Sequence, residues 1–584
     1  MTYPADRLAP VLGADAVVAP EHGLRQTAEA RATRISQSRR VLGAAAGIAV
    51  LAGTMLFAGL GRYPLWEPDE ARHAEIAREM SNGSWMLPTF HARPYHDKPI
   101  LYYWLTAAAY RAGEQGTLAA RTVSATSALL TVLAVFAWAL TTWGLWPAVY
   151  SALTLLTTIE FFVLGRFGDL NMLLTLFVTI GVLGTYDWTR RGGRGSGLIL
   201  AAIAAALGAL TKGLVAPVLI GLVGLIQLWR TGSSRLLLRR QVPVAALVFF
   251  AIAMPWYVVA GLRSPGYVHD FLFHHHLQRA MGGPRLHPEP FYFTIVATIL
   301  CFVPWALLLP AALHRALREG KDDAAAFCAA WAASVVLLFS IPSGKLVTYV
   351  LPAMPPLALL VGHYCSRLAV APPDVREGGL LRFGLGVLAA SALTAPPIAI
   401  AVTAHLGEQT WLPIAVSSLV LWIFGAATAW VALERRYERA PAVIVVAMLT
   451  VSAVFYGYGA PRVSAMISDA PMARTITATD PARRAPVVAF RTYGGSLPFY
   501  LDRPVRLLSS QRRLRRVFTR RPLVFIVTHR RHLRAFRRMQ PLFVWREARH
   551  ILLATRPLYP AQSRIEIDPR SPGSSRSSAR VEKR

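Results

Sequence analysis

A short stretch near residue 70 concentrates acids that could do chemistry. In "LWEPDEARHAEIAREM", Leu65–Met80, the acids Glu67, Asp69 and Glu70 stand within four residues. A carboxylate held beside a reacting group can accept a proton as a general base. The same acids can instead begin a helix, because Pro68 lacks the N–H that is unsatisfied in a first turn and carboxylates stabilise the positive end of the helix dipole. These residues alone do not decide between a general base and the start of a helix.

The residues after the proline predict a helix from 68 to 81 that would position one of these acids. Its i, i+3, i+4 spacing gathers five side chains on one face: Asp69, Arg72, His73, Ile76 and Met80. Such a helix can lie in a membrane interface with its polar end toward a cavity. We therefore expect Asp69 to do chemistry, and Glu67 and Glu70 mainly to favour the start of the helix.

Further polar residues interrupt the apolar parts of the chain. Asp169 stands where an apolar run begins, and it can either cap a helix there or serve as a second reactive acid. Lys212 lies between two apolar runs, and Lys345 and Tyr349 lie in "SGKLVTYVLP". A lysine at the end of a membrane helix commonly snorkels, and tyrosine is common at the interface. These residues therefore either anchor helices or belong to a site.

Two polar loops add more candidates. The stretch "RPYHDKPILYYW", Arg93–Trp104, combines a carboxylate, a lysine and aromatic residues. The aromatic residues alone are typical of a membrane interface, but the charged residues are not. A later loop carries the cluster His274–His276. Neighbouring histidines on a helix do not share a face, so at most one or two of them could bind the same metal ion.

The composition indicates a polytopic membrane protein. Of 584 residues, 54% are hydrophobic and only 16% are charged, and the mean hydropathy is +0.40. Hydropathy and loop breaks predict an all-α protein of about thirteen transmembrane helices. Their centres lie near Ala45, Ser127, Leu155, Leu176, Ala204, Leu219, Leu247, Ile299, Ser334, Leu357, Ala389, Leu419 and Val446.

The distribution of charge predicts the orientation of these spans. The net charge of +31 would suggest nucleic acid as a partner of a soluble protein, but here Lys and Arg gather at alternate loops between apolar runs. Cytoplasmic loops are enriched in these residues, so residues 1–40 are predicted to form a cytoplasmic tail. After an odd number of spans, the segment from 461 emerges outside the cytoplasm, and no nucleic-acid partner is expected.

The predicted domain organisation follows from these spans. Residues 41–460 form the membrane domain, with extracytoplasmic loops at 61–117 and 263–290, and residues 570–584 are expected to be disordered. Residues 461–569 predict a small α/β domain with strands at "APVVAFRTY", "PLVFIVTH" and "LFVWREARHILLATR" and a basic helix at 530–539. No Gly-rich loop follows a strand, which argues against a nucleotide cofactor.

The predicted orientation brings the unusual polar residues to one membrane face. Two aspartates and several cations at a membrane surface suit a reaction of a phosphate-bearing lipid, because cations stabilise a leaving phosphate while a carboxylate accepts a proton. An enzyme without a nucleotide loop would use a donor that is already activated and attached to lipid.

Several motifs occur in an order that resembles a known family. They are "EPDEARHAEIAREM", "RPYHDKPILYYWLTA", "LTKG", "PWY", "HHLQR" and "SGKLVTYVLPAMPPLALL". The chain resembles the branch of GT-C membrane glycosyltransferases that holds the aminoarabinose-lipid A transferases and protein O-mannosyltransferases. This resemblance implies inverting transfer of a sugar from a polyprenyl phosphate, such as undecaprenyl phosphate, to an extracytoplasmic acceptor. Lipid A, another envelope glycan or a protein would be the acceptor, at a bacterial inner membrane.

The resemblance also implies roles for individual residues. Asp69 would be the main catalytic carboxylate and Asp169 the second essential acid. The donor phosphate or its surroundings would be contacted by Arg72, Tyr95, Lys98, Lys212, Arg279, Lys345 and Tyr349. Relatives close to the lipid A enzyme can hold a divalent metal, zinc or magnesium or manganese, at the positions occupied here by Asp97 and His276.

Two other classes of function remain as alternatives. A transporter or flippase of lipid-linked saccharides would be expected to bury charges near the bilayer midplane and often to show paired halves. A lipid-binding homologue without activity would have no need of both Asp69 and Asp169. The gathering of charge at one face favours the glycosyltransferase.

Overall fold

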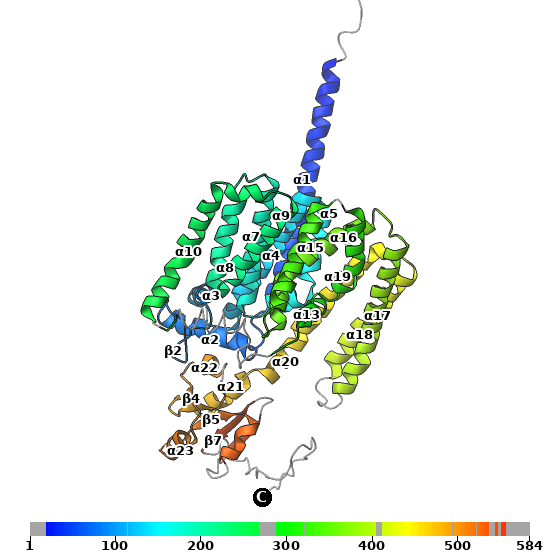
Figure 1. The fold of residues 1–584 in the computed structure, drawn as a ribbon. Helices are drawn as coiled ribbons and strands as arrows, with labels where there is room; N and C mark the ends of the chain where they lie inside the picture. Colours follow the sequence, from blue (N-terminus) through cyan, green and yellow to red (C-terminus); the bar gives the residue numbers. More distant parts are fainter. Residues whose placement is uncertain are drawn as a thin grey trace, which may run out of the picture.

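The computed structural model consists of a helical bundle and a small α/β domain, with the bundle in the upper part of the view and the domain below it (Figure 1). The residues described are 19–113, 115–264, 266–267, 288–320, 322–403, 411–492, 496–520, 523–536, 543–546 and 550–555. Most of the predicted loop 263–290 and all of the predicted tail 570–584 lie outside these ranges.

The bundle is built from the apolar runs of the sequence. Among the described residues, eight helices are long and apolar enough to cross a membrane, and a ninth span results if α5 and α6, which meet at an angle of 68°, count as one. Three shorter apolar helices, 197–212, 215–230 and 418–433, also match predicted spans. The helix at the predicted centre Ile299 has only 9 residues. The all-α polytopic fold class is confirmed. The predicted count of thirteen transmembrane helices is reached only if the three shorter apolar helices and the helix at Ile299 are counted with the nine spans.

The bundle helices follow one another through most of the chain. Their bounds are α1 Ala19–Phe57, α4 Thr117–Trp143, α5 Leu145–Leu156, α6 Ile159–Gly165, α7 Leu170–Arg190, α8 Gly197–Lys212, α9 Val215–Arg230, α10 Gln241–Arg263, α13 Phe293–Cys301, α14 Leu309–Glu319, α15 Asp323–Ser340, α16 Met354–Leu368, α17 Val375–Thr403, α18 Trp411–Leu433, α19 Ala440–Val454 and α20 Ala460–Ile467. Large apolar side chains such as Leu247, Phe250 and Ile423 are exposed on the helices. Many exposed apolar side chains on long helices are typical of a surface that a lipid bilayer covers.

The first loop forms a compact unit at the end of the bundle that faces the α/β domain (Figure 1). Helix α2, Asp69–Asn82, begins one residue after the predicted start and ends one residue after the predicted end. The antiparallel strands β1, Thr89–Phe90, and β2, Arg93–Pro94, follow it, and α3, Leu101–Ala112, leads back to the bundle. In the view, the N-terminal end of α1 projects from the opposite end of the bundle.

The α/β domain has a five-stranded sheet with strand order β4-β3-β5-β7-β6. Its elements are α21 Ala470–Thr479, β3 Val487–Phe490, α22 Leu497–Leu501, β4 Arg506–Leu508, α23 Gln511–Arg520, β5 Phe525–Thr528, η8 Arg530–Phe536, β6 Phe543–Arg546 and β7 Ile551–Ala554. Strand β3 pairs in parallel with β4 and β5, and β7 pairs antiparallel with β5 and β6. Alternate residues of the strands bury two separate apolar clusters, because successive side chains point to opposite faces of a sheet.

Three details of this domain differ from the sequence prediction. The third predicted strand is in fact the pair β6 and β7, which turns back on itself. The strand β4 and the helix α23 were not predicted, and the expected basic helix at 530–539 is a short 3-10 helix, Arg530–Phe536. These elements are short, of 3 to 10 residues, so each shows only one to three repeats of its period in the sequence.

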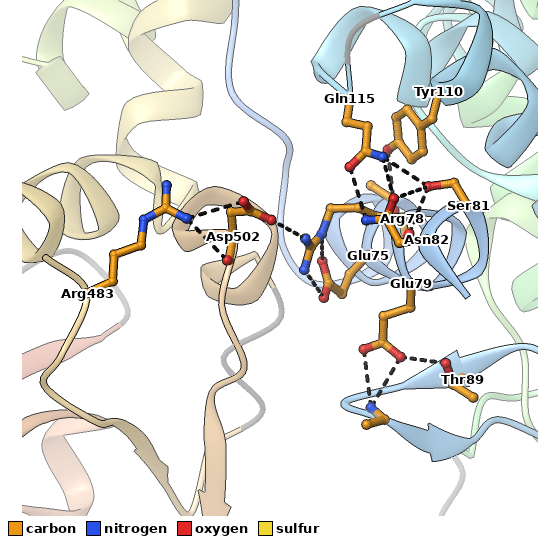
Figure 2. Close-up of polar contacts among 12 residues, drawn as sticks. Glu75, Arg78, Glu79, Ser81, Asn82, Thr89, Tyr110, Gln115, Arg483 and Asp502 are labelled. Atoms are coloured by element: carbon orange, nitrogen blue, oxygen red, sulfur yellow. Dashed lines mark hydrogen bonds and ion pairs between the residues drawn. The ribbon is translucent and has the colours of Figure 1, made fainter. Parts of the chain in front are cut away.

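Helix α2 joins the bundle to the α/β domain through ion pairs. Arg78 binds the carboxylate of Glu75 on its own helix and donates a hydrogen bond of 2.6 Å to Asp502, which also pairs with Arg483 (Figure 2). On the same helix, Glu79 accepts a hydrogen bond of 2.6 Å from the Thr89 hydroxyl of the β1–β2 hairpin. One helix therefore orients both the hairpin and the α/β domain.

Candidate functional site

The loop that leads into α2 is fixed by a buried carboxylate. The guanidinium of Arg121 on α4 donates two hydrogen bonds to Glu70, of 2.6 and 2.8 Å, and both side chains are 0% exposed. Glu70 also accepts the backbone N–H groups of Trp66 and Gly168, each at 2.8 Å. Arg121 donates further to the carbonyls of Leu60, Tyr63 and Pro64. Glu70 thus ties together three segments of the chain, which is more than starting a helix.

Glu67 points to the α/β domain instead of along its own helix. Its carboxylate accepts the backbone N–H of Ser496, 429 residues further on. Burial and the nearby Asp469 carboxylate raise the pKa of Glu67 to about 7. Beside it, the Leu65 N–H donates to the hydroxyl of Tyr500 at 2.6 Å. The expectation that Glu67 mainly favours the helix start is therefore wrong, because its hydrogen-bond partner lies in the other domain.

A cavity of about 370 Å³ opens beside the start of α2. It collects residues from the first loop, α6, α7, α8 and the segment after residue 345. Eight of the predicted site residues line it: Asp69, Arg72, Tyr95, Asp97, Lys98, Asp169, Lys212 and Tyr349. Acidic and basic residues that are far apart in the sequence thus line the same cavity.

Asp69 and Asp169 have different surroundings in this cavity. The Asp69 side chain is 48% exposed and forms an ion pair with Arg72 one turn along α2. The Asp169 side chain is only 10% exposed. A group that accepts a proton from a substrate must be reachable from the cavity. This difference favours Asp69 for contact with a substrate.

Asp169 combines the two roles that its position suggested. Its side chain accepts the Asn171 N–H at 3.2 Å and so caps α7, and it accepts a second hydrogen bond of 2.7 Å from the Asn171 amide. Lys212 donates to the other end of that amide at 2.5 Å and lies 4.6 Å from the centre of the Tyr349 ring. Burial raises the pKa of Asp169, and Lys212 opposes this shift. Asn171 therefore holds an acid and a cation in a fixed relation.

His73 is a buried neighbour of Asp169. Its Nδ1 lies 2.9 Å from the Tyr103 hydroxyl, and its Nε2 lies 3.9 Å from a carboxylate oxygen of Asp169. Burial and the nearby Arg72 lower the pKa of His73 well below its ordinary value. The ring is therefore uncharged at neutral pH. It packs against Tyr103 and Asp169 and adds no positive charge to the site.

Of the three remaining predicted residues, the structure describes Lys345, which is not among the residues that line the cavity. Lys345 is buried and donates a hydrogen bond of 2.8 Å to the carbonyl of Glu289. Arg279 and His276 lie outside the described residues. The sequence did not single out Asn171, and the only signal for it was its place in the turn "GRFGDLN" beside Asp169.

The donor set for a metal is incomplete in the described part of the chain. Asp97 lines the cavity, but no group of three or more His, Cys, Asp or Glu side chains that could hold a metal ion occurs among the described residues. Three or more such ligands are the usual requirement of a bound zinc ion.

Residues 60–271, which contain most of this cavity, match the family model described as dolichyl-phosphate-mannose-protein mannosyltransferase. A crystal structure of ArnT from Cupriavidus metallidurans bound to undecaprenyl phosphate superposes with a TM-score of 0.74 and 25% identity, over 88% of this chain and 98% of that one. The chain is thus similar to GT-C membrane glycosyltransferases in its fold and over residues 60–271. The predicted family resemblance is confirmed.

Curated arabinosyl transferases are similar to the chain over about half of its length. It is 35% identical over 312 residues to the undecaprenyl phosphate-alpha-4-amino-4-deoxy-L-arabinose arabinosyl transferase of Aeromonas hydrophila, with 52% of this chain and 56% of the relative covered. The enzyme of that name from Pseudomonas aeruginosa is 32% identical over 350 residues, with 58% and 63% covered. The chain thus spans less than two thirds of the length of these relatives.

Proposed function

We propose that this protein transfers a sugar from a polyprenyl phosphate donor to an acceptor outside the cytoplasm. The observation that carries the proposal is one cavity, lined by three aspartates together with the cations Arg72, Lys98 and Lys212. The fold supports it, because the ArnT structure of the same fold is described as bound to undecaprenyl phosphate. The names of the curated relatives favour 4-amino-4-deoxy-L-arabinose as the sugar.

The cations of the cavity would bind the phosphate of the donor. Lys98 and Lys212 suit such a contact as point charges, and Arg72 adds a planar fork of donors. As the bond between the sugar and the phosphate breaks, negative charge grows on the leaving phosphate, and fixed cations stabilise that charge. Tyr95 and Tyr349 line the same cavity and would shape the binding surface around the phosphate.

Asp69 would act as the general base. The acceptor hydroxyl gives its proton to the Asp69 carboxylate, and its oxygen forms the new bond to the anomeric carbon on the face opposite the phosphate. The carbon–oxygen bond to the phosphate breaks, and polyprenyl phosphate leaves with the electron pair, so that the anomeric configuration inverts. Asp69 is the better exposed acid, whereas Asp169 would position the site through Asn171 and Lys212.

Some assignments of the family remain proposals for this chain. Arg279 would complete the phosphate site, and Lys345 would support it through the Glu289 carbonyl. A divalent metal would need Asp97 and His276 together, and elemental analysis of the purified protein tests for it.

The acceptor and the side of the membrane are also proposed. Lipid A, another envelope glycan or a protein would supply the attacking hydroxyl at the outer face of a bacterial inner membrane. The position of the cavity at one end of the bundle, beside the α/β domain, suits a transferase better than a transporter, whose charges are expected near the midplane. Transfer of labelled sugar from the undecaprenyl phosphate donor to lipid A by the purified protein tests the proposal, and its absence with every acceptor class would contradict it.

A further inference from the structure

A second cavity, of about 450 Å³, opens in the α/β domain away from the site described above. Apart from Arg93, its polar lining comes from residues that stand shortly after three parallel strands. Arg491 and Thr492 follow β3, Ser509 follows β4, and His529 and Arg531 follow β5. The cavity therefore lies at the carboxyl edge of the parallel part of the sheet.

The topology makes this edge a place where ligands commonly bind. The chain passes from β3 to β4 on one side and then crosses β3 to reach β5 on the other, as the strand order β4-β3-β5 requires. The direction of the connections reverses between β3 and β5. In open α/β sheets, ligands bind in the crevice outside the carboxyl ends of the strands at such a reversal.

The charge of the cavity selects an anion. Arg93 from β2 of the first loop lines it together with Arg491 and Arg531, and no acid is among the described residues of its lining. All three arginines are exposed. Guanidinium groups bind phosphate oxygens through parallel hydrogen bonds, so three of them around one hollow suit a phosphate group.

The two parts of the chain that form this cavity are held together by α2 (Figure 2). Glu79 accepts hydrogen bonds from the Thr89 hydroxyl and the Ala92 N–H, and so fixes the hairpin that carries Arg93. The preceding residue of α2, Arg78, binds Asp502 of the α/β domain. Helix α2 therefore contacts both the hairpin and the domain that contribute residues to the cavity.

A chain of hydrogen bonds leads from this cavity toward the first one. The Thr492 hydroxyl lies 3.0 Å from Nε2 of His550, whose Nδ1 lies 2.7 Å from a carboxylate oxygen of Asp469. The Asp469 N–H donates to the hydroxyl of Ser496 at 3.2 Å, and the Ser496 N–H donates to Glu67. Glu67 stands two residues before the proposed base, so the two cavities belong to one connected unit.

We propose that the cavity at the ends of β3, β4 and β5 binds a phosphate group of the acceptor, an inference that rests on the proposed function. The phosphate of the donor is assigned to the first cavity, so a second anion site in the same unit fits a second, phosphorylated substrate. The site would select phosphorylated acceptors and hold them against the first loop through Arg93, Arg491 and Arg531.

Direct binding tests this site without requiring turnover. Full-length protein is compared with Arg491→Gln/Arg531→Gln and with Arg506→Gln, an exposed arginine at the opposite end of β4. Native mass spectrometry measures the affinity for bisphosphorylated lipid A and for the same lipid A without its phosphates. Parallel arms use inorganic phosphate, and vesicles of phosphatidylglycerol against phosphatidylcholine. Size-exclusion profiles and thermal unfolding show that the variants are folded.

The proposal predicts that wild-type protein and Arg506→Gln prefer phosphorylated lipid A by about tenfold or more, because a hydrogen bond to a charged group is lost without the phosphate. The double variant should lose this preference. If it keeps the preference, the cavity is not the site. If it loses only inorganic phosphate or phosphatidylglycerol binding, the cavity holds a free anion or a membrane lipid, which also overturns the proposal. Selective binding without sugar transfer would instead contradict the proposed function alone.

Discussion

Replacing Glu70 by Gln should destabilise the site more than its place in a first helical turn suggests. Glu70 and Arg121 form an ion pair of 2.6 Å with both side chains at 0% exposure. The change removes the negative charge and leaves the guanidinium buried without its partner. It also turns one acceptor oxygen into a donor, so that the N–H of Trp66 or of Gly168 loses its acceptor.

The magnitude follows from this burial. Breaking a buried ion pair by removing one partner costs about 3–5 kcal/mol, because the remaining charge cannot be solvated. The carbonyls of Leu60, Tyr63 and Pro64 still accept from Arg121, so the lower end of that range is the better expectation. An exposed ion pair of the same type contributes about 0–1 kcal/mol.

The chain offers a matched control for this change. Arg191 and Asp187 form an ion pair of 2.8 Å on α7, with side chains 63% and 42% exposed. Thermal unfolding of the purified protein should show a fall of several degrees for Glu70→Gln and almost none for Asp187→Asn. Equal melting temperatures of the two variants would refute the reasoning. Limited proteolysis within 61–117 should also become faster in Glu70→Gln only.

Three further changes test other parts of the site. Lys98→Met and Lys212→Met should each weaken donor binding by about tenfold or more in a binding assay, and unchanged affinity in both would reduce these lysines to membrane anchors. Because the folded pKa of Glu67 is raised from 4.5 to about 7, the stability it contributes is present below pH 4.5 and is lost as the pH rises through 7. The melting temperature of wild type should therefore fall more between pH 5 and 8 than that of Glu67→Gln, and parallel curves would contradict this. A C-terminal alkaline phosphatase fusion should be active if the α/β domain lies outside the cytoplasm, whereas an inactive fusion would overturn the orientation.

Local patterns in the sequence were enough to find the helix of the first loop and the acids that lie on it. Proline, acids and i, i+3, i+4 spacing act over one or two turns, so α2 was predicted to within one residue at each end. The wider grouping of polar residues followed from the predicted order of the spans, and the structure brings eight of the named side chains to one cavity. Their roles in catalysis and phosphate binding stay predictions.

The sequence could not reveal contacts between distant segments. Glu67 and Glu70 look alike in the printed sequence, but one accepts from Ser496 and the other pairs with Arg121. These partners lie 429 and 51 residues away, and no local pattern specifies them. Lys345 likewise stands in a motif of the family but binds the carbonyl of Glu289. Side-chain partners set by tertiary packing need the fold itself.

The most direct test of the central claim is sugar transfer by purified Asp69→Asn, measured together with donor binding. If Asp69 is the base, this variant should bind donor normally and lose transfer by about 10² or more. Glu67→Gln is the matched control, because at pH 6 Glu67 is mostly protonated and Gln resembles it, so its transfer should stay within a few-fold of wild type. Transfer by Asp69→Asn at nearly the wild-type rate would contradict this role and would leave Asp69 only the role of stabilising the first turn of α2.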